Sequence, residues 1–323
     1  MRKPGPTSMP DRRRPCAAVT RRDVVRGAGA AVACATLGPT RSAFAAAPHR
    51  LTVGAFELTV VSDGHLVLPT SFLAPDAPAA ERAAILADSG ENGAEFNSPT
   101  NCTLIRAGNA LILIDTGSGP HFMPTAGKLA DNFDAAGIDR RTITMVVYTH
   151  GHPDHLWGVV DDFEEPLFPQ ASYVVAAAEW DFWHGANALS GLPAERAGFV
   201  TGARRSYAHI KDKVRMVKPG DEIVSGLRVL ATPGHTQGHV SLEVAGGDGL
   251  VIGGDALTHA LISFRHPEWR PQADHVPDLA ASTRTRLLDR LATDRMKLIG
   301  FHLPYPGVGY VERTDGAYRF VAT

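Results

Sequence analysis

Cysteine and long apolar segments are scarce in this 323-residue sequence. Two of its three cysteines, Cys16 and Cys34, lie within the first 45 residues, so Cys102 stands alone in the rest of the chain. A single cysteine excludes an internal disulfide and a thiolate-rich structural zinc site there. No stretch after residue 50 reaches the roughly 20 apolar residues of a membrane-spanning helix. Stability must therefore come mainly from a packed core.

Two sequence patterns are also missing. No Gly-x-Ser-x-Gly motif is present, which argues against a serine nucleophile on a strand-to-helix turn. No repeat of fixed short period is visible, which argues against a solenoid. What the composition does contain, 44% hydrophobic residues with 32 glycines and 23 prolines, is typical of a globular, layered sheet protein with many turns.

The first 45 residues differ in composition from the rest of the chain. They place the pair Arg21-Arg22 before an apolar run of small residues, 27–37, and a small-residue cleavage pattern, Ala43-Phe44-Ala45. A basic region, an apolar region and a cleavage pattern in this order predict a twin-arginine export signal over residues 1–45. The expected location is then periplasmic or secreted. A disordered basic tail is the alternative interpretation.

Charge is uneven between this segment and the remainder. Residues 1–45 hold nine of the 32 basic side chains and two of the 34 acidic ones, so the mature chain would carry a net charge near −9. Such a surface repels phosphate backbones, which argues against a nucleic-acid partner.

Residues 46–323 predict a single domain in which strands and helices alternate. Strands are expected at 51–61, then after a turn at 62–64 up to residue 68, and at 102–106, 110–114, 143–148, 172–176, 227–231, 240–245, 250–252, 297–301 and in a hairpin at 309–321. Helices are expected at 79–87, 124–136, 154–160, 194–214 and 276–292, and a helix or turn at 177–183. Segment 69–100 is expected to be a surface excursion near the mouth of the site. Two strand-rich halves with helices predict packed sheets with helices outside.

Histidine and aspartate side chains gather where apolar runs end. The motif Thr-His-Gly-His-Pro-Asp-His at 149–155 follows the apolar run 143–148, and His235, Asp255 and His302 each follow a later run in a Gly- or Pro-containing turn. Strand ends present side chains to a shared cleft, so we expect these residues to converge. Imidazole and carboxylate together favour zinc or a similar divalent ion.

The motif H-x-H-x-D-H with these downstream residues resembles the metallo-β-lactamase superfamily over residues 51–323. The resemblance implies an α/β protein with the αβ/βα sandwich fold, in which two mixed sheets carry helices on their outer faces. It implies two divalent metal ions, zinc before others, with these ligands: His150, His152 and His235 for one ion, Asp154, His155 and His302 for the other, and Asp255 as the bridge. Asp115 is implied to support the ligands without binding metal itself.

By the same resemblance, the reaction is attack of a metal-bridging hydroxide on a carbonyl or phosphoryl centre. Asp255 would position this nucleophile, and Asp154 is the second carboxylate assigned to catalysis. No separate serine or cysteine nucleophile is needed.

Within the superfamily, the chain is similar to methyl parathion hydrolase and its lactonase relatives at 58–64, 117–127, 178–183 and 302–309. This similarity implies a substrate pocket walled by Phe122, Trp183 and Phe199. Small-molecule esters or lactones are the expected substrates, with aryl phosphotriester (organophosphate) hydrolysis by the same site. Relatives of this kind also suggest a homodimer.

Two alternatives stay open. One is a β-lactam hydrolase, although the zinc β-lactamases nearest in motif lack a counterpart of Asp255. The other is a non-catalytic metal-binding protein of the same fold, which the complete set of seven ligand positions disfavours. Seven further histidines receive no role and are interpreted as surface or supporting residues: His65, His121, His184, His239, His259, His266 and His275. Glu179 and Asp181 are interpreted as solvated.

Overall fold

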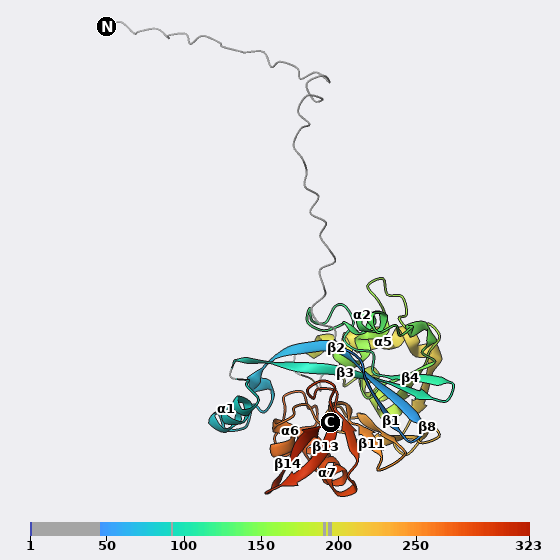
Figure 1. Ribbon diagram of the computed structural model, residues 1–323. Coiled ribbons are helices and arrows are strands. Elements are labelled where there is room, and N and C mark those ends of the chain that lie inside the picture. Colours follow the sequence, from blue (N-terminus) through green and yellow to red (C-terminus); the bar gives the residue numbers. More distant parts are fainter. Residues whose placement is uncertain (2–45, 92, 190–191, 193–195) are drawn as a thin grey trace, which may run out of the picture. The chain divides into compact units, whose positions relative to one another are not determined.

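Two mixed β-sheets of seven strands each form the centre of the described part of the chain (Figure 1). The computed structural model describes residue 1 and residues 46–91, 93–189, 192 and 196–323. Apart from Met1, the predicted export signal lies outside the described residues. The remainder, from Ala45 to Thr323, forms one compact unit.

The first sheet changes from antiparallel to parallel pairing along its width. Its strands lie in chain order: β1 (His49–Val53), β2 (Phe56–Pro69), β3 (Glu95–Ala107), β4 (Ala110–Ile114), β5 (Met145–Val147), β6 (Ser172–Ala176) and β7 (Val214–Val217). The pairs from β1 to β4 are antiparallel, and those from β4 to β7 are parallel. Because β4 to β7 are parallel, they end at the same edge of the sheet, and the segment after β5 leaves the sheet at that edge.

The second sheet is antiparallel except for one central pair. Its order is β14 (Ala317–Ala322), β13 (Val308–Thr314), β12 (Lys297–Ile299), β11 (Leu250–Ile252), β10 (Val240–Val244), β9 (Leu227–Ala231) and β8 (Glu222–Val224). Only β11 and β12 run parallel. The turns after β9, β11 and β12 carry His235, Asp255 and His302, in that order.

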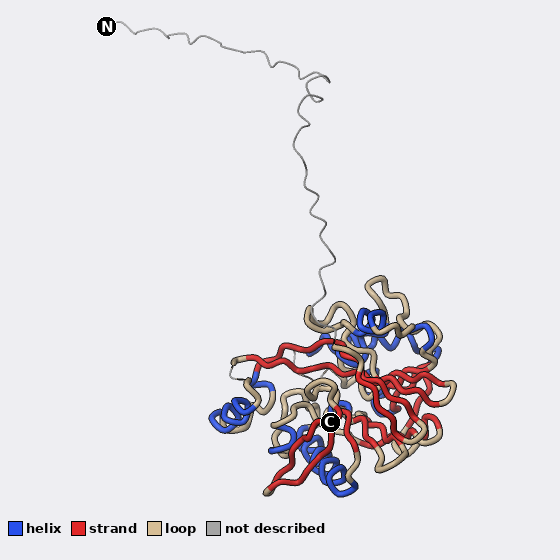
Figure 2. The backbone as a smooth tube through the Cα atoms, viewed as in Figure 1, coloured by secondary structure: helices blue, strands red, loops and turns tan. Residues whose placement is uncertain are grey.

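Helices occupy the outer layers (Figure 2). The α-helices are α1 (Ala79–Asp88), α2 (Leu129–Ala135), α3 (Pro153–Leu156), α4 (Ala177–His184), α5 (Ala197–Ile210), α6 (Ile262–Arg265) and α7 (Pro277–Asp294), and the short 3₁₀ turns are η1 (Thr70–Phe72), η2 (Arg140–Thr142), η3 (Trp157–Val159), η5 (Lys211–Lys213) and η6 (Gly254–Ala256). In the described part of the chain, no helix has the length and apolar character needed to cross a bilayer.

Three apolar layers hold this arrangement together. The middle layer joins the inner faces of the two sheets, for example Ile112 of β4 and Leu242 of β10. The outer layers bury Phe133 of α2 and Tyr207 of α5 on the first sheet, and Leu288 of α7 on the second. The predicted αβ/βα sandwich with two mixed sheets is therefore confirmed.

The predicted turn at 62–64 is wrong. The chain turns earlier, at Gly54, and β2 then continues through residues 62–64 with a bulge between Ser62 and Gly64. The Asp63 carboxylate at this bulge accepts hydrogen bonds from the backbone N–H groups of Ser118, Gly127 and Leu129, at 2.8, 3.0 and 2.9 Å. These bonds fix the segment before α2.

Other boundaries also differ from the predictions. The helix expected from 124 begins only at Leu129, and the helix expected over 194–214 ends at Ile210. The short edge strands β7 and β8 were not predicted, and β3 begins at Glu95 instead of residue 102. Segment 69–100, expected to be a surface excursion, is therefore partly regular. Its last residues begin β3, which pairs with β2 in a long two-stranded ribbon, and α1 lies between these two strands in the chain.

Candidate metal centre

The motif at 149–155 is placed by a parallel strand. β5 ends at Val147, and the chain then turns into α3, which begins at Pro153. Proline suits the first helical position because its missing N–H needs no partner there. Glycine is required at position 151, because a Cβ atom would lie 2.4 Å from the indole nitrogen of Trp183. The local sequence thus brings the flanking histidines close to the sheet edge.

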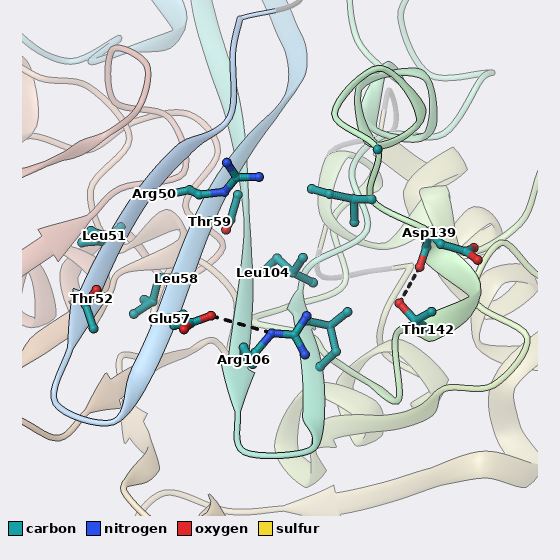
Figure 3. A pocket seen from close by; sticks show the side chains of 13 residues that line it. Arg50, Leu51, Thr52, Glu57, Leu58, Thr59, Leu104, Arg106, Asp139 and Thr142 are labelled. Atoms are coloured by element: carbon teal, nitrogen blue, oxygen red, sulfur yellow. Dashed lines mark hydrogen bonds and ion pairs between the residues drawn. The ribbon is translucent and has the colours of Figure 1, made fainter.

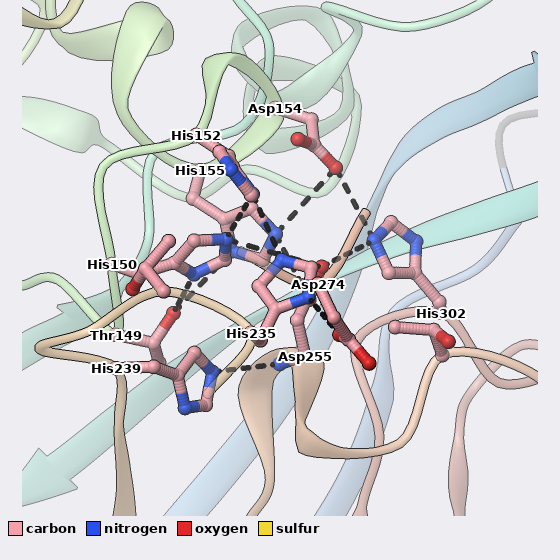
Figure 4. A network of polar contacts seen from close by, with 12 residues as sticks. Thr149, His150, His152, Asp154, His155, His235, His239, Asp255, Asp274 and His302 are labelled. Atoms are coloured by element: carbon pink, nitrogen blue, oxygen red, sulfur yellow. Dashed lines mark hydrogen bonds and ion pairs between the residues drawn. The ribbon is translucent and has the colours of Figure 1, made fainter. Parts of the chain in front are cut away.

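Seven candidate ligands converge where the strand ends of the two sheets meet (Figure 4). Four come from the 149–155 motif of the first sheet, and three come from the turns after β9, β11 and β12 of the second. Their donor atoms form two groups, each within 4.8 Å: His150, His152, His235 and Asp255 in one, Asp154, His155 and His302 in the other. All seven residues are buried. The structure therefore brings together the two ligand sets that the resemblance implies.

Asp255 lies between the two groups. Its Oδ2 atom is 3.2 Å from Nε2 of His235 and 3.1 Å from Nε2 of His302, and its Oδ1 atom is 3.0 Å from Nε2 of His155. One carboxylate thus contacts rings from both groups, as a residue that bridges two ions must.

The donor atoms fit two divalent cations. Asp154 Oδ2, His155 Nε2 and Asp255 Oδ1 are buried and form no well-aligned hydrogen bond among the described residues, although His155 Nε2 lies 3.0 Å from Asp255 Oδ1 and 3.5 Å from Asp154 Oδ2. Nδ1 of His152 lies 2.9 Å from Nε2 of His150 and 2.8 Å from Nε2 of His235. Lone pairs that face one another this closely are favourable around a cation, and buried polar atoms without partners are otherwise costly. The arrangement supports two sites for divalent metal ions.

The pKa shifts differ between the two ligand groups. Burial, followed by the neighbouring imidazoles, lowers the pKa of His150 and of His152 well below the ordinary value. Burial raises the pKa of Asp255, but His302 and His155 outweigh it and hold that pKa well below its usual range. Neutral imidazoles and an ionised carboxylate are the forms that bind metal. Burial lowers the pKa of His155 and of His302, but the carboxylates of Asp255 and Asp154 outweigh it, so the pKa of His155 lies well above its usual range and that of His302 is raised to about 10. A metal ion would therefore displace a proton from each of these two rings.

Asp115 supports the ligands from behind, where the resemblance places it. Its carboxylate accepts hydrogen bonds from the backbone N–H and the hydroxyl of Thr149, each at 2.8 Å, and lies 2.8 Å from Nδ1 of His155. The Nδ1–H group of His155 donates to this carboxylate, which leaves its Nε2 atom for a metal.

Glu179 is a supporting residue that sequence reasoning missed. The prediction that it is solvated is wrong, because its side chain is 1% exposed. It accepts hydrogen bonds from the N–H groups of Gly151 and Trp183, at 2.8 and 2.6 Å, and from Thr236 and Gly238, at 2.6 and 3.1 Å. Its position among aromatic residues at 178–183 was the one available signal. Asp181, in contrast, is exposed as predicted.

Two more supporting residues lie behind the centre. Asp274, which the sequence analysis did not single out, contacts Nδ1 of His235 at 3.1 Å through Oδ1. His239 accepts the backbone N–H of Asp255 at 3.0 Å, and burial lowers its pKa to about 3. His239 is therefore a neutral supporting residue, in line with its interpretation.

An apolar cavity of about 310 Å³ opens above the ligands. Its walls include Leu68, Phe96, Phe122 and Phe199, and its floor includes ligands from both groups. Of the three predicted wall residues, Phe122 and Phe199 line this cavity, with ring centroids 6.0 Å apart. Trp183 does not: its side chain is fully buried beneath the 150–152 turn and donates to Glu179.

A larger surface groove of about 680 Å³ lies away from this chemistry (Figure 3). It is lined by β1, β2 and β3 residues and by segment 137–142, with an ion pair between Arg106 and Glu57 at 3.8 Å. No candidate metal ligand lines it. The smaller cavity is therefore the better candidate for substrate binding.

The fold and the ligand set define a class of protein. Residues 97–302 match the metallo-beta-lactamase superfamily, and the chain belongs to this superfamily. Among solved structures, it is similar to AidC, a dizinc quorum-quenching lactonase in complex with a product, with 26% identity, a TM-score of 0.81, and coverage of 86% of this chain and 98% of that one. It is likewise similar to the hydrolase AbOPH, with 28% identity, a TM-score of 0.80, and coverage of 87% and 99%.

Curated relatives match a smaller part of the chain. Metallo-beta-lactamase domain-containing protein 1 of Xenopus laevis is 30% identical over 196 residues, which cover 60% of this chain and 67% of that protein. A probable metallo-hydrolase of Mycobacterium tuberculosis is 28% identical over 180 residues, which cover 48% and 56%. The family, the two candidate metal sites and the lactonase neighbours support a metal-dependent hydrolase acting on small molecules.

Proposed function

We propose that this protein is a dinuclear metal-dependent hydrolase of lactones and related esters. The observation that carries the proposal is the position of Asp255, which joins two buried groups of ligand atoms at the floor of an apolar cavity. The similarity to AidC, a dizinc lactonase, supports lactones as the substrate class.

The metal ligands, the two aspartates and the apolar wall of the cavity have different roles in the proposed reaction. Zinc is the ion that five imidazoles and two carboxylates favour. Two bound ions would polarise the substrate carbonyl and lower the pKa of a water molecule. Asp154 and Asp255 offset part of the positive charge, and Asp255 holds the two sites together. The apolar wall receives the hydrophobic part of the substrate. It also excludes bulk water, and this exclusion strengthens the electrostatic interactions in the site.

Aryl phosphotriester hydrolysis by the same site is the second candidate function. Phe122 and Phe199 meet edge to face at the cavity wall, and Phe199 also contacts the ring of His152, at a centroid distance of 6.0 Å. Aromatic edges of this kind can pack against a flat aryl leaving group. Because Trp183 does not line the cavity, two rings carry this role instead of the three that were predicted.

A substrate panel separates the candidates. The zinc-loaded protein is assayed on N-acyl homoserine lactones, aryl esters, an aryl phosphotriester and a chromogenic cephalosporin, together with metal analysis. We expect close to two ions per chain and lactone turnover above that of every other class. The opposite ranking would assign the site to phosphotriesters or β-lactams. A stable protein that binds metal but turns over none of these substrates would support the non-catalytic metal-binding alternative.

Replacing Asp255 tests the proposed centre directly. Asp255→Ala should lower hydrolysis by at least about a thousandfold, because it removes the shared ligand and the charge at the reacting centre. Metal content should also fall, which atomic absorption measures. Asp181→Ala, an exposed aspartate on α4, is the matched control and should keep full activity. Full activity in Asp255→Ala would contradict the proposal.

Two properties of the whole protein are also proposed. Export rests on the twin-arginine pattern in residues 1–45 and implies a periplasmic or secreted enzyme. A homodimer rests on the resemblance to lactonase relatives. Light scattering of the purified protein measures the second property, and a monomer mass at micromolar concentration would contradict it.

A further inference from the structure

Two neighbouring residues outside the ligand set each contact one ring of the three-histidine group. Oδ1 of Asp274 lies 3.1 Å from Nδ1 of His235, and Nε2 of His275 lies 2.9 Å from Nε2 of His152. We infer that Asp274 and His275 form an outer clamp that orients His235 and His152 toward a common ion. The inference rests on the metal-dependent function proposed above. It adds two positioning residues that determine how tightly an ion is held by the group of His150, His152 and His235.

The clamp is built into the backbone next to His235. The N–H of His275 donates to the carbonyl of His235, and the N–H of Val276 donates to the carbonyl of Gly234, each at 2.9 Å. Residues 274–276 therefore run beside the turn that carries one of the ligands. These two backbone hydrogen bonds fix the position of the His275 ring relative to the three-histidine group.

A buried arginine anchors the other side of the clamp. Nη2 of Arg284, on α7, donates to Oδ2 of Asp274 at 2.8 Å. The same guanidinium donates to the carbonyl oxygens of Pro267 and Trp269, at 2.8 and 2.9 Å, and its side chain is 1% exposed. Buried charge pairs persist when hydrogen bonds satisfy the remaining protons, as they do here. The Asp274 carboxylate is thus held rigidly toward His235.

The clamp also determines where each ring carries its proton. His152 faces the group through Nδ1, which lies 2.8 Å from Nε2 of His235. A ring that binds metal through Nδ1 carries its proton on Nε2, and Nε2–H of His152 then donates to His275. His235 faces the group through Nε2, so its Nδ1–H donates to Asp274. Each contact selects the tautomer that leaves the metal-facing nitrogen with a free lone pair.

The segment that carries the clamp also lines the substrate cavity. Pro271 and Ala273 belong to the cavity wall, and the N–H of Gln272 donates to the carbonyl of Phe72, another wall residue, at 2.8 Å. One continuous stretch, 271–275, therefore contributes both to ligand orientation and to the cavity wall.

Substitution at His275 tests the clamp without removing a ligand. His275→Phe keeps the ring and removes the acceptor for His152, whereas His275→Gln keeps an acceptor in a similar place. Chelator competition on the zinc-loaded full chain measures the affinity of both sites. We expect the phenylalanine variant to bind one of its two ions about 10–100-fold more weakly, so that stoichiometry under competition falls from near two toward near one. The glutamine variant should recover most of this loss.

Controls separate the clamp from simple misfolding and from failure of the proposed function. His209→Phe, on α5 and outside the cavity lining, should leave both affinities unchanged. Urea unfolding of the metal-free proteins shows whether each variant folds, and His275→Leu repeats the comparison if the phenylalanine variant does not. Wild-type affinity at both sites in a folded His275→Phe variant would overturn the clamp alone. A wild-type protein that binds no metal would overturn the proposed function as well.

Discussion

Glu179 shows how one buried side chain can hold two ligand-bearing turns together. Its two oxygens accept four hydrogen bonds, two from Gly151 and Trp183 on one side and two from Thr236 and Gly238 on the other. Every partner in this set can act as a donor, so the ionised carboxylate satisfies all of them at once. Burial raises the pKa of Glu179, and the four hydrogen bonds oppose that rise.

Replacement of this carboxylate by an amide should therefore be costly. In Glu179→Gln, the side-chain NH₂ group faces a backbone or indole N–H, and at least one buried donor loses its acceptor. We expect the free energy of unfolding, measured in urea, to fall by about 1–3 kcal/mol. Asp181→Asn, on the exposed side of the same helix, should change it by less than about 0.5 kcal/mol. Equal stability of the two variants would contradict this role for Glu179.

Local sequence could predict the ligands, and the family resemblance supplied Asp115 behind them, but neither pointed to Glu179 or Asp274. Each ligand follows an apolar run and lies at a Gly- or Pro-containing turn, and this pattern is visible within a few positions. Three of the four partners of Glu179, in contrast, lie 28 and 57–59 residues away in the chain. Asp274 lies 39 residues from His235. Contacts of this length depend on how the two sheets dock, which no local pattern encodes.

Among the elements, the bulge in β2 positions one segment of the cavity wall. Asp63 projects from the bulge and binds three backbone N–H groups of segment 118–129, which includes Phe122 of the cavity wall. Burial raises the pKa of Asp63 from 3.8 to about 6, against the lowering effect of these three hydrogen bonds. Its protonation is thereby linked to stability at mildly acidic pH.

The sign of this linkage can be measured. Because the pKa of Asp63 is higher in the folded state, the native protein takes up a proton as the pH falls through about 6. The free energy of unfolding of the wild type, relative to Asp63→Asn, should therefore decrease by up to about 3 kcal/mol as the pH rises from 4 to 7. Urea unfolding of both metal-free proteins at several pH values provides the measurement. An increase over the same range would mean that the three N–H donors outweigh burial.

Elements with strong periodicity were predictable, and short or irregular ones were not. The strand at 172–176 and the helix following it lie where the apolar pattern predicts, with the helix ending one residue later. The edge strands β7 and β8, of four and three residues, are too short for an alternating pattern to stand out. At the bulge, Ser-Asp-Gly has the composition of a turn, yet the chain pairs with β3 on both sides of it and continues as one strand.

At the scale of the whole molecule, the metal centre joins two sheets that also meet through an apolar layer and through hydrogen bonds such as those of Glu179 with Thr236 and Gly238. Four ligands belong to the first sheet and three to the second. Removal of metal should therefore lower global stability. With free zinc a thousandfold above its Kd, binding contributes about 4 kcal/mol, so excess chelator should lower the Tm by roughly 10 °C. Calorimetry before and after re-addition of zinc checks this, and an unchanged Tm would argue against zinc as the resident ion.

Export is a prediction that rests on residues 1–45. In Arg21→Lys/Arg22→Lys, the twin-arginine pair is lost but the charge is kept, so the protein should remain in the cytoplasm. Cell fractionation and immunoblotting measure its location. Arg12→Lys/Arg13→Lys, outside the pair, should be exported normally, and normal export of both variants would remove the support for this route.

The division of ligands between the sheets also has a kinetic consequence. His150 and His302 are 152 positions apart in the chain, and neither sheet alone contains a full ligand group. A folding intermediate with only one sheet formed therefore has no complete site, and ion capture must follow the docking of the two halves. Interactions formed after the folding barrier slow unfolding and leave the folding rate nearly unchanged. Bound metal should accordingly extend the lifetime of the native enzyme without helping it to fold faster.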